Sequence, residues 1–147
     1  MSDLRDFARI GLADHGLCVL STLRPDTTIQ ASVVNAGVVD YPMSGKSVVA
    51  LVAAGGTRKL ANIRRNPLVT VVAKSGWEWV AVEGNAYLWG PDDPVAGVTA
   101  DDLRRLLREV FTAAGGTHDD WDEYDRIMAA ERRTVVFITP KRIYSNQ

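Results

Sequence analysis

The feature of this sequence that most constrains its fold is a series of short apolar runs, each the length of one strand. Several of them alternate apolar and polar residues, which is the period of a strand with one buried face. A turn at Pro25-Asp26 separates the first two runs and favours a hairpin. The strands are expected at residues 17–23, 28–34, 47–53, 68–73, 77–89, 134–139 and 142–144. Six or seven antiparallel strands of this kind predict a closed or partly closed barrel.

Helical segments interrupt this series and gather late in the chain. Leu103, Leu107 and Val110 follow the spacing of a helix with one buried face. Thr57 stands at an expected N-cap, and Pro67 ends the helix that follows. The helices are expected at residues 3–13, 58–66, 99–114 and 119–131. The sequence therefore predicts a mainly β fold (β+α) with flanking helices.

Length and composition indicate a single domain, residues 1–147. Cys18 is the one cysteine and lies in an apolar run, so we expect a buried thiol in a reducing compartment. The apolar runs are too short to span a membrane, and the first residues carry acids early, unlike a secretory leader. We therefore expect a cytoplasmic protein without a membrane partner.

The net charge of −1 hides an uneven distribution of charge. Residues 27–77 hold six bases and one acid, whereas residues 92–131 hold eleven acids and four arginines. We expect the first segment to be able to meet an anion and the second to form an acidic helical surface. The basic excess is too small to indicate nucleic-acid binding.

The best local signal for a ligand is the junction at residues 55–59, Gly-Gly-Thr-Arg-Lys, where a strand ends and a helix begins. Glycines let the backbone approach a ligand, and a helix start offers free N–H groups. Bases in the first turn face the positive end of the helix dipole, which disfavours them unless an anion binds there. Two interpretations stay open from these residues alone: a phosphate site, or a capped helix with solvated charges.

Two further patterns each have a binding and a structural interpretation. Trp77 and Trp79 are expected on one strand face, where they either stack on a ring system or pack beneath the late helices. Gln30 and Ser32 share a face of an earlier strand and either bond the edge of a ligand or face solvent. The sequence holds no convincing Ser/His/Asp, Cys/His or metal-ligand set, so the catalytic residues stay unknown and no metal site is predicted.

Three segments taken together resemble one protein family, in matching order along most of the chain. They are residues 57–67 (Thr-Arg-Lys-Leu-Ala-Asn-Ile-Arg-Arg-Asn-Pro), residues 76–84 (Gly-Trp-Glu-Trp-Val-Ala-Val-Glu-Gly) and residues 117–124 with residues 131–133 after them. They are similar to the F420-dependent branch of the flavin/deazaflavin oxidoreductases. This is the mycobacterial type, with the split β-barrel of the pyridoxamine-phosphate-oxidase-like, FMN-binding kind.

The resemblance implies a homodimer with two cofactor sites at the interface, each built from both chains. It places the cofactor phosphate at Lys59 and the start of the helix, and places the deazaflavin ring along one strand. Asn62 would face the cofactor's tail, and Trp79 would lie near the ring or the substrate. The implied cofactor-binding residues are Gln30, Ser32, Val52, Thr57, Arg58, Lys59, Asn62 and Trp79.

The implied activity is hydride transfer from reduced coenzyme F420 to an electron-poor small organic acceptor, such as an enone, a quinone or a tetrapyrrole. The cofactor performs this chemistry, which agrees with the missing acid–base set. F420 is favoured over FMN because its long anionic tail would use the groups at Lys59, Asn62, Arg64 and Arg65. Two alternatives remain: an FMN-dependent oxidase or reductase on the same barrel, and a non-catalytic carrier of a flavin or haem.

Overall fold

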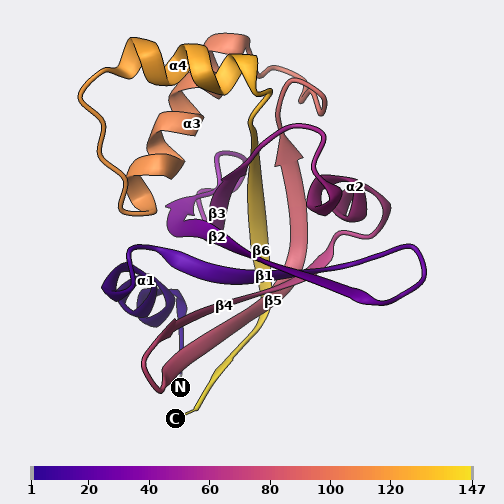
Figure 1. Cartoon of the computed structure of the whole chain (residues 1–147), viewed down its shortest axis with the longest axis vertical. Helices are drawn as coiled ribbons and strands as arrows, with labels where there is room; N and C mark the ends of the chain where they lie inside the picture. The colour runs from indigo at the N-terminus through magenta and orange to yellow at the C-terminus, as the bar shows by residue number, and fades with distance from the viewer. Residues whose placement is uncertain (1, 147) are drawn as a thin grey trace.

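Six antiparallel strands close into one barrel in the computed structural model, which describes residues 2–146 (Figure 1). Met1 and Gln147, the ends of the expected single domain, lie outside the described residues. Around the barrel the strand order is β1-β2-β3-β6-β5-β4, and β1 pairs with β4 to close it. The strands are β1 (Leu17–Leu23), β2 (Ile29–Asp40), β3 (Ser47–Ala53), β4 (Leu68–Ser75), β5 (Glu78–Trp89) and β6 (Thr134–Ser145). The predicted mainly β barrel with flanking helices is confirmed.

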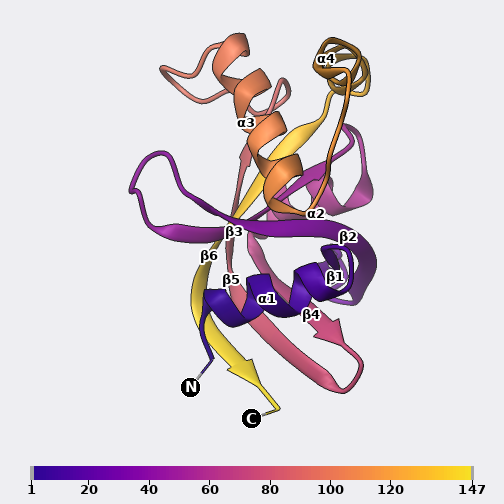
Figure 2. The same ribbon diagram turned by 90° about the vertical axis from the view of Figure 1, so that its left-hand side faces the viewer.

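Four helices in the described residues surround the barrel: α1 (Leu4–Ala13), α2 (Arg58–Arg65), α3 (Ala100–Ala113) and α4 (Trp121–Ala130). Helix α1 lies against β2, β4 and β5 (Figure 2). Helix α2 lies on the side of the barrel opposite α1 in Figure 1, and α3 and α4 form a layer at the top of the barrel. Among residues 2–146, no helix has the length and apolar character of a membrane span.

The barrel interior is one apolar core, closed at both ends by helices. Val71, Val82 and Ile138 lie inside it, fully buried. Phe7 and Ile10 of α1 join this core at one end, and α2 joins it at the other through Leu60 and Ile63. The expected buried thiol of Cys18 also lies here, and desolvation by burial raises its pKa to about 12. Helices α1 and α2 are therefore held by the same apolar contacts that fill the barrel.

A second apolar core lies outside the barrel, beneath α3 and α4. It joins alternate residues of β3 and β6, such as Ala50 and Phe137, to Leu107 and Val110 of α3 and Tyr124 of α4. The strands that form both cores are buried on two faces, which explains why residues 48–53 and 135–138 are continuous apolar runs.

Two predicted strand boundaries are wrong, each for a local reason. Strand β2 continues to Asp40 instead of ending at Val34, because its second half pairs with β3. Strand β6 is continuous from Thr134 to Ser145, whereas Pro140 predicts a break. A bulge accommodates the proline: Gly84 of β5 pairs with Pro140 and Glu83 pairs with Arg142, which leaves one extra residue on β6.

The bulge also explains why position 84 is a glycine. A Cβ atom placed there would lie 1.9 Å from the carbonyl oxygen of Thr139, closer than any real contact. Strand β6 can cross β5 at this distance only because Gly84 has no side chain.

We expect Gly84→Ala to lower the free energy of unfolding by about 1–3 kcal/mol, because the backbone of β6 must move away. Gly11→Ala is the matched control: the new Cβ would lie 3.7 Å from that of Ala73, and alanine favours the helix by up to about 1 kcal/mol. Urea unfolding of the two variants measures both values. Equal stabilities would contradict the close approach at Gly84.

Candidate phosphate and ring-binding site

The junction between β3 and α2 holds two glycines for different reasons. A Cβ at Gly55 would lie 2.7 Å from the backbone of Arg132, and its N–H donates to the carbonyl oxygen of Glu131 at 3.0 Å. Gly55 is therefore explained by packing against the turn between α4 and β6. Gly56 has a φ of +77° with open space where a Cβ would be. The backbone beside Gly56 is accessible to a ligand.

Thr57 starts α2 in the expected N-cap position, but its hydroxyl does not cap the helix. The backbone has an N-cap conformation, and the structure shows no side-chain bond to the first-turn N–H groups. Its Oγ1 is buried and has no hydrogen-bond partner among residues 2–146. Buried polar atoms normally have a partner, because an unmade bond is costly. The unpaired hydroxyl and the uncapped helix start together form a site that suits an oxyanion.

Arg58 and Lys59 follow in the first turn of α2. Arg58 is exposed and Lys59 is half-buried, and within the described residues neither forms an ion pair. Their positive charges therefore remain available to an anion at the helix start. A phosphate fits this set of groups: one hydroxyl, free backbone N–H groups and two cations.

The two later bases of α2 are already engaged within the chain. Arg64 forms two hydrogen bonds to Asp93, at 2.8 and 2.6 Å, and Arg65 donates to the backbone carbonyl of Leu23. Asp93 belongs to the turn after β5 and was not anticipated as a partner. The continuous positive run that the sequence suggests for a cofactor tail is therefore reduced to Arg58 and Lys59.

Asn62 lies inside the barrel end instead of on the exposed side of α2, where a cofactor tail would run. Its side chain is 1% exposed. Its Nδ2 donates to Thr22 Oγ1 at 3.0 Å and to Gln30 Oε1 at 3.2 Å. The sequence does not predict the role of Thr22, because a single threonine in an apolar strand gives no signal of a polar partner 40 residues away.

Gln30 and Ser32 lie on the same face of β2, where this strand has β1 as its only paired neighbour within the described residues. The pairing of β2 with β3 begins at Ala36, so β3 has diverged from β2 before this point and leads into α2. Both side chains are half-buried. The structure thus brings Gln30 against α2 through Asn62, and Ser32 lies two residues further along the same face of β2.

Val52 and Trp79 do not join this group. Val52 packs on the outer core beneath α3 and α4, opposite the face of β3 that fills the barrel. Trp79 lies at the other end of β5, edge-on to Tyr144 with ring centroids 6.1 Å apart. Trp77 lies in the β4–β5 turn, 92% exposed, so the prediction that it shares a strand face with Trp79 is wrong.

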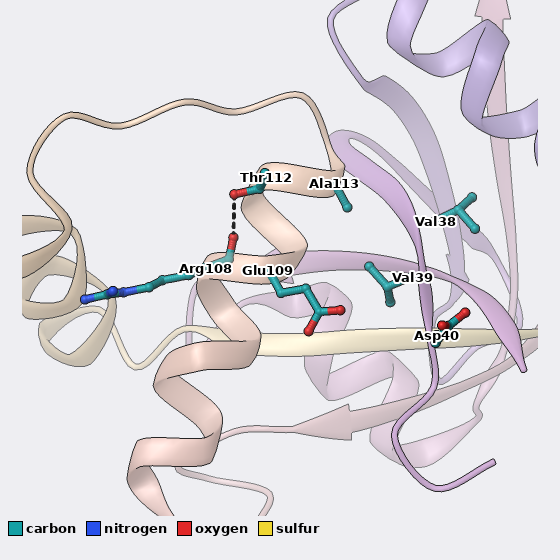
Figure 3. Close-up of a pocket in the computed structure, with 7 residues that line it drawn as sticks. All are labelled: Val38, Val39, Asp40, Arg108, Glu109, Thr112 and Ala113. Atoms are coloured by element: carbon teal, nitrogen blue, oxygen red, sulfur yellow. Dashed lines mark hydrogen bonds between the residues drawn. The ribbon is translucent and has the colours of Figure 1, made fainter. Parts of the chain in front are cut away.

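A surface hollow of about 590 Å³ lies elsewhere, between α3 and the end of β2 (Figure 3). Asp40 and Glu109 line it, while Arg108 points away towards α4, where its Nε donates to Asp125 at 2.9 Å. Two carboxylates without a facing cation do not suit a phosphate. The hollow is therefore separate from the site at α2.

The chain matches a family model described as pyridoxamine 5'-phosphate oxidase over residues 4–147. Solved structures of the same fold include a conserved hypothetical protein from Mycobacterium tuberculosis (20% identity, TM-score 0.69, covering 99% of this chain and 84% of that chain). An F420 reductase is 15% identical with a TM-score of 0.60, covering 87% and 88%. A pyridoxamine 5'-phosphate oxidase-related, FMN-binding protein from Nostoc punctiforme is 11% identical with a TM-score of 0.63, covering 99% and 84%.

At these identities the solved structures show a shared fold, the split barrel, and nothing finer. The family match extends over nearly the whole chain and includes all six strands of the barrel. The protein is therefore a member of the pyridoxamine 5'-phosphate oxidase family.

Proposed function

We propose that this protein is an oxidoreductase that binds a flavin-type cofactor by its phosphate at the start of α2, and that this cofactor is reduced coenzyme F420. The observation that carries the proposal is the buried, unpaired hydroxyl of Thr57 beside an uncapped helix start and two free cations. A phosphate would supply acceptors to all of these groups at once.

The chain's own residues would bind and orient the cofactor. Thr57, Arg58 and Lys59 would hold the phosphate, while Gln30 and Ser32 would lie along the ring. When bound, the cofactor supplies hydride transfer to an electron-poor acceptor, such as an enone, a quinone or a tetrapyrrole. The protein would contribute orientation and a surface from which water is excluded.

Two candidate cofactors each have an observation in their favour. F420 is supported by the family resemblance of residues 57–67 and by the fold shared with an F420 reductase. FMN is the second candidate, because the burial of Asn62 and the bonds of Arg64 and Arg65 leave few groups for a tail beyond the phosphate. The fold shared with an FMN-binding protein agrees with this second candidate.

The outer face of β1, β2 and β4 supports a homodimer. Val33 of β2 pairs with Val19 of β1, which pairs with Val72 of β4, so an apolar stripe crosses three strands. Val33 is 67% exposed, and Ile29, four residues earlier on the same face of β2, is 64% exposed. Contiguous exposed apolar surface of this kind typically marks an interface. We propose that two copies of the chain pack on this apolar stripe.

A dimer would also explain why Trp79 lies far from α2 in one chain. Trp79 is at the end of β5 beside α1, where its neighbour Glu78 bonds Arg9, whereas α2 lies across the barrel (Figure 1). If Trp79 contributes to a cofactor site, that site belongs to the second copy. The proposed site is therefore shared between two chains.

Lys59→Ala should weaken cofactor binding about tenfold or more, because a charge-assisted contact to phosphate contributes roughly 1.5–3 kcal/mol. Thermal stability should not change, since the side chain lies outside the core. Fluorescence titration with F420 and with FMN measures the affinity. Lys46→Ala, at an exposed position in the β2–β3 loop, is the control and should bind as the wild type does. Unchanged affinity of Lys59→Ala would overturn the phosphate assignment.

Side-by-side titrations decide between the two cofactors. We expect F420 to bind about tenfold more tightly than FMN, and its affinity to fall more steeply as salt rises, because its tail carries more negative charges. The deazaflavin without phosphate and tail should bind most weakly. Equal or tighter binding of FMN would assign the FMN enzyme. Binding of both without reduction of any quinone or enone would indicate a carrier.

Light scattering at micromolar concentration should give the mass of a dimer. Val33→Glu places a charge in the apolar stripe and should produce a monomer that binds the cofactor about tenfold more weakly or worse. Ile127→Glu is the matched control, because Ile127 is an exposed residue of α4 outside the stripe. A wild-type monomer, or a Val33→Glu monomer with full affinity, would contradict the shared site.

A further inference from the structure

Asn62 is a buried amide whose two N–H donors are both used. It stands on α2 between Leu60 and Ile63, which fill the barrel end, and it is 1% exposed. One donor of Nδ2 bonds Thr22 Oγ1 and the other bonds Gln30 Oε1. Thr22 and Gln30 are register partners on β1 and β2. Asn62 thus connects the helix that begins at the candidate phosphate site to the strand that carries Gln30.

These bonds decide which end of the Gln30 side chain faces outward. A glutamine amide has one acceptor end and one donor end, which are alike in shape. Because Gln30 Oε1 accepts from Asn62, its NH₂ group points away from Asn62, and within residues 2–146 that group donates to no partner. With Nδ2 of Asn62 facing Gln30, the reversed orientation of Gln30 would set two NH₂ groups against each other and leave Asn62 with an unmade bond, which disfavours it about tenfold or more.

We propose that Asn62 is a positioning residue that holds Gln30 with its N–H donors towards the carbonyl edge of the cofactor ring. This inference rests on the proposed function, because it assumes that a flavin-type ring binds along Gln30. FMN and F420 share this edge, and reduction increases the negative charge on it. A fixed donor there stabilises the reduced ring and raises the reduction potential of the bound cofactor.

The orientation of Gln30 can be tested without any cofactor. Hydrogen exchange of side-chain amides, followed by NMR on the free protein, should show a slow Asn62 NH₂ and a fast Gln30 NH₂. Asn62→Asp replaces the donor by an acceptor of the same shape, so Gln30 should turn its NH₂ inward and exchange slowly. A Gln30 NH₂ that is already protected in the wild type would overturn the proposed orientation.

The effect on the ring is tested with F420 and FMN as probes. Gln30→Glu keeps an acceptor for Asn62 but replaces the outward donor by an oxygen. Gln30→Glu and Asn62→Asp should both weaken binding of the oxidised probe about tenfold, weaken binding of the reduced probe more, and lower the potential of the bound probe. Asn66→Asp is the control, because it adds the same charge at the end of α2 and keeps the acceptor that bonds the Leu68 N–H at 3.1 Å.

The outcomes separate the two levels of the proposal. If Asn62→Asp does not fold, Gln30→Glu gives the answer, since it leaves the core intact. An unchanged potential in Gln30→Glu with bound probe would refute the role of Asn62 while the proposed function stands. If neither F420 nor FMN binds the wild type, the proposed function fails, and the assignment of Gln30 to a cofactor ring fails with it.

Discussion

The pairing of β1 with β4 is the constraint on which the rest of this structure depends. It closes the six strands into a barrel, so neither strand leaves an unpaired edge along Cys18–Ser21. A closed barrel encloses an apolar interior whose two ends must be covered. Phe7 and Ile10 of α1 cover one end, and α2 covers the other with Leu60 and Ile63. The position of α2, and with it the candidate phosphate site, follows from this requirement.

The same geometry leaves part of β2, the proposed ring-binding strand, without a second neighbour. Strand β3 separates from β2 before Ala36 because it must lead into α2, so the first half of β2 is paired on one side only. Gln30 lies in this half, where a ligand can approach its outward donor. Asn62 connects α2 to β1 and β2 from within the core. A buried amide is stable there only if its hydrogen bonds are formed.

The four bases of α2 fall into two pairs, one bonded within the chain and one at the candidate phosphate site. Arg64 and Arg65 fix α2 to the turn after β5 and to the end of β1, whereas Arg58 and Lys59 have no such partner among the described residues. The first pair stands at the helix C-terminus, where the dipole favours cations, and the second stands at the N-terminus, where it does not. The proposed phosphate site would offset this unfavourable placement of two cations.

The helices α3 and α4 cover only part of the outer barrel surface. They bury the outer side of β3 and β6, while the stripe on β1, β2 and β4 stays exposed. Ion pairs between the layers, such as Arg108 with Asp125, hold α4 on α3, and this arginine keeps the pKa of the Asp125 carboxyl below its usual value. The acidic helical surface expected from residues 92–131 is thus partly neutralised by its own arginines.

The sequence by itself determined most strands and helices and indicated a closed or partly closed barrel, because strand period and helical spacing are local properties that each segment carries alone. It also located the helix start at Thr57, where glycines, a threonine and two bases stand together. It could not show that the Thr57 hydroxyl lacks a partner or that Asn62 turns into the core. It equally could not show that Arg64 meets Asp93, or that Pro140 sits opposite a bulge. These contacts depend on which distant segments of the chain lie side by side. Asn62 and Gln30, for example, are separated by 32 positions in the sequence. Barrel closure determines these contacts, because only the closed sheet fixes which side of α2 faces the interior.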